Sequence, residues 1–218
     1  MTTQSVGRHQ IPEIVAKVAG ARVRELQGGY LKDLSLAVAM LAQLRRGAGK
    51  VPADVPELWG MTGTEGLFDE VPELAKWESE AAWAENALFL ALTLYASHQQ
   101  SHRNAPMHKP DVELGEAVRR LSGEEIDEPI RRRFVRVGAA STPEVLAYRM
   151  REIITLLRGA AIPLDYATLA HRLYQAQTPD GMAEVRRRWG RSFHAFRPSP
   201  APSADASTGE DPTPKDAE

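Results

Sequence analysis

Residues 77–95 read WESEAAWAENALFLALTLY, and this stretch decides the fold class. Its apolar side chains recur every three or four residues, which is the spacing of one face of an α-helix. The pattern returns along the chain, and no stretch alternates apolar and polar residues for long enough to be a strand. The other stripes are Leu31, Leu34, Val38 and Leu41; Leu114, Val118 and Leu121; Ile130, Phe134 and Val137; Leu146, Met150, Ile153 and Leu157; Leu164, Ala167 and Leu173; and Met182, Val185, Trp189 and Phe193.

Prolines fall between these stripes or at their starts, where a missing backbone N–H costs little. A helix over about residues 11–26 is the weakest of the set, because Gly20 interrupts it. We therefore predict an all-α fold, a single-domain bundle of about seven or eight helices over residues 9–197. Residues 1–8 are expected to form a flexible N-terminus.

The last segment, residues 198–218, differs from the rest in composition. It is rich in Pro, Ser, Ala and Asp, and it has five acidic residues against the single base Lys215. Without large apolar side chains it cannot bury enough surface to offset the entropy cost of ordering. We predict a disordered acidic C-terminal tail, which leaves 26 basic and 24 acidic residues, a balance of +2, on residues 1–197.

Composition also excludes several classes of protein. The 218 residues include no cysteine, which rules out a disulfide framework, a thiolate nucleophile, Cys-ligated zinc and iron–sulfur clusters. The first residues lack the apolar segment of a signal peptide, and no stretch is long and apolar enough to cross a bilayer. We expect a cytoplasmic protein that does not contact a membrane.

No known catalytic or metal-binding pattern is complete. The segment GAGK at residues 47–50 lacks the first glycine and the final Ser or Thr of a phosphate-binding loop. His98 and His102 share a helical face and His108 follows, but Gln99 stands where a metalloprotease needs Glu, so we interpret them as exposed histidines at a helix end. No G-x-S-x-G occurs either. We therefore predict a protein that is not an enzyme and has no metal or cofactor.

The basic residues occur in clusters, and clustered arginine on a nearly neutral body suggests local anion binding. For any one cluster a solvated helix face is the commoner explanation, but four in one small helical domain favour a surface for a polyanion. The clusters are Arg45 and Arg46 followed by Lys50; Arg119 and Arg120; Arg131, Arg132 and Arg133 followed by Arg136; and Arg186, Arg187 and Arg188 followed by Arg191.

The clusters differ in whether acidic residues lie at helical spacing from their arginines and can pair with them. Arg187 and Arg191 are expected to point away from the apolar stripe without an acidic neighbour, whereas Arg188 has Glu184. Arg136 has only arginines at helical spacing on its N-terminal side. The remaining positions have a competing explanation. Asp127 and Glu128 precede Arg131 and Arg132 by four residues, Glu116 precedes Arg120 by four, and Arg45, Arg46 and Lys50 follow a helix end where cations are stabilising in any case.

The order of several segments resembles the CasB family, the small subunit of Cascade, the type I-E CRISPR surveillance complex. The resemblance covers about residues 27–194 and lies in YLKDLSLAVAMLAQLRRGAGKVPADVPELW, ALTLYASHQQS, PMHKPDVELGEAVRRL, PIRRRFVRV and GAAIPLDYATLAHRLYQAQTPDGMAEVRRRWGRSF. It implies an all-helical, non-catalytic subunit that associates as a dimer within the complex. Its implied partners are the backbone subunits, the guide RNA, the target DNA and the displaced strand of the R-loop, which it stabilises in antiviral defence.

An alternative is a stand-alone DNA-binding regulator of the helix-turn-helix type, formed by residues 162–189. Against it, the last helix is dominated by arginine and has few side chains suited to reading base edges. Under the first hypothesis the candidate nucleic-acid-binding residues are Arg45, Arg46, Lys50, Arg119, Arg120, Arg131, Arg132, Arg133, Arg136, Arg187, Arg188 and Arg191.

Overall fold

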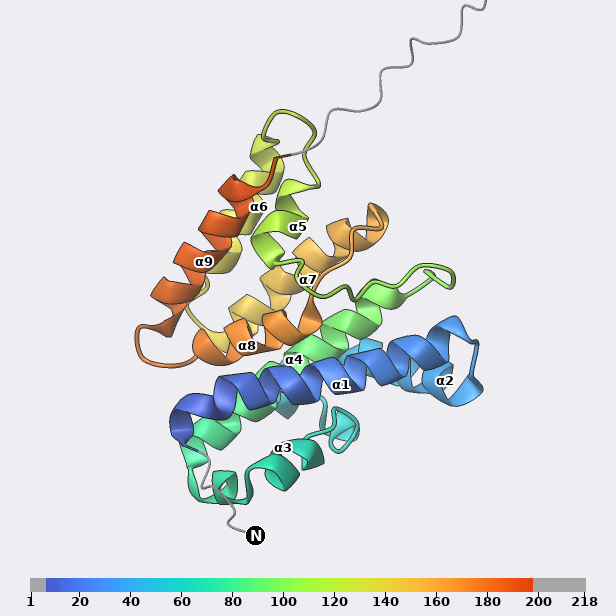
Figure 1. Cartoon of the computed structure of the whole chain (residues 1–218), viewed down its shortest axis with the longest axis vertical. Coiled ribbons are helices and arrows are strands. Elements are labelled where there is room, and N and C mark those ends of the chain that lie inside the picture. The colour runs from blue at the N-terminus through green and yellow to red at the C-terminus, as the bar shows by residue number, and fades with distance from the viewer. Residues whose placement is uncertain (1–6, 198–218) are drawn as a thin grey trace, which may run out of the picture.

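Helix α4 (Glu78–Gln99) runs through the middle of the protein, with helices from both halves of the chain around it (Figure 1). Every residue from Ala87 to Ala96 is buried, on all sides of the helix. A helix that is buried all round must be surrounded by other elements, because water would otherwise meet an apolar face. One hydrophobic core built on α4 accordingly includes residues from each α-helix of the described chain.

The structure is a computed structural model that describes residues 7–197. This range holds nine α-helices and no strand, so the all-α prediction is confirmed with one or two helices more than expected. Besides α4 they are α1 (Ile11–Leu31), α2 (Ser35–Leu44), α3 (Glu65–Glu70), α5 (Leu114–Arg119), α6 (Glu128–Gly138), α7 (Pro143–Gly159), α8 (Tyr166–Gln175) and α9 (Gly181–Ala195). Short 3-10 helices occupy Arg8–Gln10, Arg45–Gly47, Pro52–Asp54, Pro56–Leu58 and Pro72–Lys76.

The helices form two groups, which α8 connects. In Figure 1, α1 to α4 make the lower part of the molecule, and α5, α6, α7 and α9 make the upper part. Helix α8 packs on both α1 and α4, α7 also packs on α4, and α9 lies along α5. The C-terminal half therefore presents α6 and α9 at the outside of the molecule, away from the α1–α4 layer. Within residues 7–197 no helix combines the length and hydrophobicity that crossing a membrane requires.

The N-terminal helices depart from the sequence prediction in two ways. Helix α1 continues to Leu31 because Gly20 does not interrupt it: this glycine is buried where α1 meets α8, and an added Cβ would lie 3.0 Å from the Cβ of Ala167. The stripe that begins at Leu31 is not one helical face. The chain turns at Asp33, whose φ is 55°, so Leu34 is 55% exposed and precedes a separate helix, α2.

The predicted terminal segments lie mostly outside the described residues. Of residues 1–8, only 7 and 8 are described, and Arg8 is part of the first 3-10 helix. The predicted acidic tail, 198–218, is entirely outside them. The short helix α3 is the one that the periodicity missed, because six residues are too few to show a repeat.

The histidines at the end of α4 are part of the core rather than exposed as predicted. His98 is fully buried, and its Nδ1 lies 2.9 Å from the hydroxyl of Tyr166. His108 is also buried, and its Nδ1 accepts a hydrogen bond from the Tyr166 backbone N–H at 3.2 Å. His102 is half-buried and bonds the Arg158 carbonyl. No group of three or more His, Asp or Glu side chains suited to a metal ion occurs in residues 7–197.

Burial of His98 predicts a specific pH dependence of stability. Desolvation lowers the pKa of His98 to about 3, from an ordinary value near 6.5 in the unfolded chain. Between these pH values the unfolded state binds a proton that the native state does not. The free energy of unfolding therefore falls as the pH falls through this range, by up to about 1.4 kcal/mol per pH unit.

The measurement is urea unfolding of wild type and His98→Asn at several pH values between about 7 and 5. Asparagine keeps a polar partner for Tyr166 but does not titrate, so the stability of the variant should depend less steeply on pH. His108, His102 and all carboxylates remain in both proteins, and the difference between the curves therefore reports His98 alone. Parallel curves would show that His98 is not held neutral.

Helix α9 approaches α5 at a glycine. A Cβ added at Gly115 would lie 2.1 Å from the Trp189 carbonyl oxygen and 2.7 Å from the Phe193 nitrogen, so only a residue without a side chain fits.

Gly115→Ala should lower the free energy of unfolding by about 2 kcal/mol or more, because the two backbones must move apart. Gly190, on α9 with open space around its Cβ position, is the matched control. Gly190→Ala should keep or raise stability by up to about 1 kcal/mol, and equal losses in both variants would contradict the close packing.

Candidate nucleic-acid interface

Helix α6 presents four arginines on one short amphipathic element. Asp127 caps its first turn by accepting a hydrogen bond from the Ile130 N–H at 2.9 Å, and Pro129 occupies the first turn, where no N–H is needed. Phe134 and Val137 are buried. Because the apolar residues turn inward, the arginines of this helix, Arg131, Arg132, Arg133 and Arg136, are all exposed.

Acidic neighbours divide these four arginines into two pairs. Glu128 lies 3.6 Å from Arg132, as the spacing predicted, and it also accepts from Arg131 at 2.6 Å, for which the spacing had indicated Asp127. The hydrogen bond from Arg131 lowers the pKa of Glu128, which keeps that carboxylate charged. Arg133 and Arg136 form no ion pair with any described residue. These two arginines therefore remain available for an external anion.

Helix α9 lies beside α6 and adds a second row of arginines. Phe134 of α6 stacks on Phe193 at 5.5 Å between ring centroids and meets Trp189 at 6.4 Å. Farther along, Arg186 donates to the Gly138 carbonyl at 3.3 Å. The aromatic contact thus places the two arginine-rich helices side by side, with eight arginines against two glutamates, a formal charge of +6. We call this surface the α6–α9 face.

The prediction that Arg187 on α9 lacks an acidic partner is wrong. Arg187 was expected to have no acidic neighbour, but Glu184 precedes it by three residues and the two side chains form an ion pair at 2.6 Å. Glu184 also accepts from Arg188 at 3.2 Å, and hydrogen bonds from both arginines lower its pKa. Arg191 alone of the predicted α9 residues has no ionic partner in residues 7–197.

Two residues that the sequence analysis did not select extend this face onto α7. Arg149 donates to the Arg136 carbonyl at 2.5 Å, and the Tyr148 ring beside it is 60% exposed. Together with Glu144 and Glu152, these residues line a shallow hollow between α6 and α7. An exposed aromatic ring next to arginines is typical of surfaces on which unpaired bases stack. The sequence could have indicated Tyr148, because it follows Leu146 by two positions and so lies on the side of the helix opposite the apolar stripe.

The predicted pair on α5 has another role. Arg119 is only 6% exposed, and its guanidinium donates to the carbonyls of Gly123 at 2.8 Å and Glu124 at 2.7 Å. It fixes the loop that follows α5 and does not reach the surface. Arg120 is half-buried, pairs with Glu116 and lies 5.0 Å from the centroid of the Phe196 ring. Both arginines are held by the protein itself.

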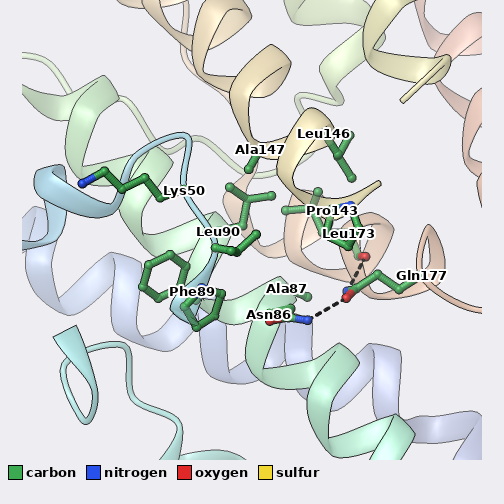
Figure 2. Close-up of a pocket in the computed structure, with 12 residues that line it drawn as sticks. Lys50, Asn86, Ala87, Phe89, Leu90, Pro143, Leu146, Ala147, Leu173 and Gln177 are labelled. Atoms are coloured by element: carbon green, nitrogen blue, oxygen red, sulfur yellow. Dashed lines mark hydrogen bonds between the residues drawn. The ribbon is translucent and has the colours of Figure 1, made fainter. Parts of the chain in front are cut away.

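The remaining predicted cluster lies elsewhere on the molecule. Arg45 and Arg46 belong to a 3-10 helix that follows α2, and Lys50 is in the next loop. None of the three forms an ion pair with a described residue. Figure 2 shows Lys50 at the edge of a small apolar pocket between α4, α7 and α8, with its amine directed away from the lining. The cluster is therefore a separate basic site, not a continuation of the α6–α9 face.

That pocket also bears on catalysis. Its volume is about 30 Å³, room for about one water molecule, and Asn86 and Gln177 at its wall bond each other at 3.2 Å. The other lining residues are mostly apolar. Nothing in its lining pairs a nucleophile with a base.

The chain is similar to CRISPR-associated proteins of known structure. A family model described as CRISPR-associated protein Cse2 matches residues 40–194. The crystal structure of CasB from Thermobifida fusca is similar at 52% identity with a TM-score of 0.75, over 83% of this chain and 97% of that one. A Cse2-family CRISPR-associated protein from Thermus thermophilus shares the fold at 22% identity and a TM-score of 0.57, over 83% of this chain and 98% of that one. The curated proteins give no match.

Proposed function

The chain belongs to the Cse2 (CasB) family of CRISPR-associated proteins, and from this we propose that it is the non-catalytic small subunit of a type I-E Cascade complex. In this role it binds nucleic acid through arginines and stabilises the R-loop by holding the displaced DNA strand. The family assignment agrees with the resemblance found in the sequence. It gives no support to the helix-turn-helix regulator, since the matched region includes both α8 and α9.

The observation that supports nucleic-acid binding best is the α6–α9 face. Two helices that the Phe134–Phe193 contact holds together present eight exposed arginines. Arg133, Arg136 and Arg191 have no acidic partner in residues 7–197, so binding a phosphate breaks no existing ion pair. Where pairs exist they are exposed, and exposed pairs contribute about 1 kcal/mol or less. A phosphate can therefore compete for those arginines too.

Arginine suits a strand that has no fixed sequence. A guanidinium binds phosphate oxygens in bidentate fashion and also stacks on unpaired bases. Phosphate contacts do not read sequence, which is appropriate when the guide RNA provides all specificity. Tyr148 beside Arg149 supplies an exposed ring for stacking next to these cations. We accordingly expect binding without base preference and with strong dependence on salt.

Modest contacts are sufficient for this role. Exchange of a DNA duplex for an RNA–DNA heteroduplex is close to balanced, so a few phosphate contacts can shift it toward the open state. A strand held on the α6–α9 face cannot re-anneal until it dissociates. We propose the backbone subunits, the guide RNA and the target DNA as partners, and a second copy of this chain as a dimer partner within the complex. Arg45, Arg46 and Lys50 form a second proposed contact.

The test removes three of the four arginines of the α6–α9 face that have no acidic partner in residues 7–197; the fourth, Arg186, already donates to the Gly138 carbonyl. Arg133→Ala with Arg136→Ala and Arg191→Ala should weaken binding of single-stranded DNA and shorten the lifetime of the R-loop in the assembled complex. Because each single-strand phosphate contact contributes about 0.7 to the slope of log affinity against log salt, that slope should fall by about 2.

The matched control is Lys32→Ala with Lys76→Ala and Lys109→Ala, three exposed cations away from the α6–α9 face. It removes the same charge and should leave the salt slope nearly unchanged. If both triple variants changed the salt slope equally, binding would depend on net charge alone. The α6–α9 face would then not be the binding site. A strong preference for one duplex sequence would instead favour the regulator.

A further inference from the structure

We propose that the acidic segment 198–218 docks on the α6–α9 face of its own chain and competes there with nucleic acid. The occupant is part of the same polypeptide, and it follows directly on the helix that forms half of the surface. The competition rests on the proposed function, because it requires that nucleic acid binds this face. The docking of the segment does not depend on the proposed function. Three properties support the assignment: charge, position and length.

The charges of the two parts are complementary. Residues 198–218 have five carboxylates, Asp205, Glu210, Asp211, Asp216 and Glu218, against Lys215, a formal charge of −4. Helices α6 and α9 together have a formal charge of +6. No other pair of helices in the described chain has so large a positive charge. Carboxylates bind arginine in the same planar, bidentate way as phosphates do, so the segment offers the chemistry of a phosphate chain.

The surface also has a groove in which a chain can lie. Between α6 and α9 there is a cavity of about 220 Å³ whose floor is formed by Phe134, Trp189 and Phe193. Arg131 and Arg186 also line it, and Val135 at its side is 55% exposed. An apolar floor with cations at the rim accepts a chain that alternates apolar or proline residues with carboxylates. The second half of the segment has this character, since Pro212 and Pro214 lie among its acids, while the other three prolines precede the first acid.

The position and length of the segment make this route accessible. The described chain ends at Arg197, two residues after α9, and His194 in the last turn of α9 lines the same groove. Helix α9 is 15 residues long, about 22 Å. An extended, proline-rich segment of 21 residues reaches about 65 Å, enough to reverse and run back along all of α9.

The spacing of its acids agrees with this path. The loop before α6 is acidic, with Glu124, Glu125 and Asp127 exposed near the end of α9, and it repels carboxylates. Residues 198–204 are uncharged, and they span about 22 Å when extended. The first acid of the segment, Asp205, therefore comes after enough chain to pass this loop and reach the arginines.

The direct test uses the absence of cysteine from the chain. Ser207→Cys in the full-length protein gives a single site for a spin label among the acids of the segment. The label should broaden the backbone amide signals of α6 and α9 and leave those of α1 sharp. Replacing the five acids by Asn and Gln should remove the broadening. Equal, weak effects on α1 and α9 would overturn the docking, and this readout needs no nucleic acid.

The competition is tested with oligothymidylate at low salt. A tethered segment acts at an effective concentration in the millimolar range, so the neutralised segment should raise affinity by about two- to tenfold. The control neutralises five exposed acids elsewhere: Asp54, Glu57, Glu65, Asp69 and Glu78. It changes net charge equally and should affect affinity less.

Unchanged affinity in the neutralised protein would overturn the competition. The proposed function fails separately, if the Arg133, Arg136 and Arg191 variant binds the probe as wild type does. In that case broadening of α6 and α9 by the spin label would still establish docking of the segment.

Discussion

The contact of Phe134 with Trp189 and Phe193 is the interaction on which the arrangement depends. Each ring is at most 9% exposed, and together they hold α6 against α9. On its other side α9 rests on α5 at Gly115, where the backbones are too close for any side chain. Two helices that lie far apart in the sequence thereby become one surface. Burial of three aromatic rings places arginines of opposite helices beside one another without requiring any attraction between them.

Electrostatics then determine which arginines are available. Like charges at helical spacing destabilise a helix slightly, and one glutamate on each helix offsets part of that cost. Glu128 and Glu184 each pair with the nearest two arginines, while Arg133, Arg136, Arg186 and Arg191 remain without a carboxylate in residues 7–197. The face is thus stable without a ligand and still strongly positive. On the same property rest both proposals for this face, the binding of phosphates and the docking of the acidic segment.

Much of the fold followed from the sequence because helical periodicity reports burial directly. The stripes in α4, α7 and α9 became buried faces, with Met150 and Trp189 inside as their spacing required. Periodicity failed at the turn around Asp33, because the apolar spacing continues across this left-handed residue, where the Leu34 N–H bonds the Gly29 carbonyl and α1 ends. It also missed α3, which is too short to repeat. His98 was misjudged because its burial depends on Tyr166, a residue far along the chain.

The candidate site was less accessible to such reasoning. The Arg187–Glu184 pair was present in the spacing and was overlooked, whereas the burial of Arg119 arises from the loop carbonyls around it. Which clusters join could not be seen either, because the α6–α9 contact is tertiary. Arginine-selective chemical labelling of the assembled complex, with and without an R-loop, tests the central claim most directly. The account predicts protection of Arg133, Arg136 and Arg191 by the R-loop; unchanged reactivity there, with protection elsewhere, would contradict it.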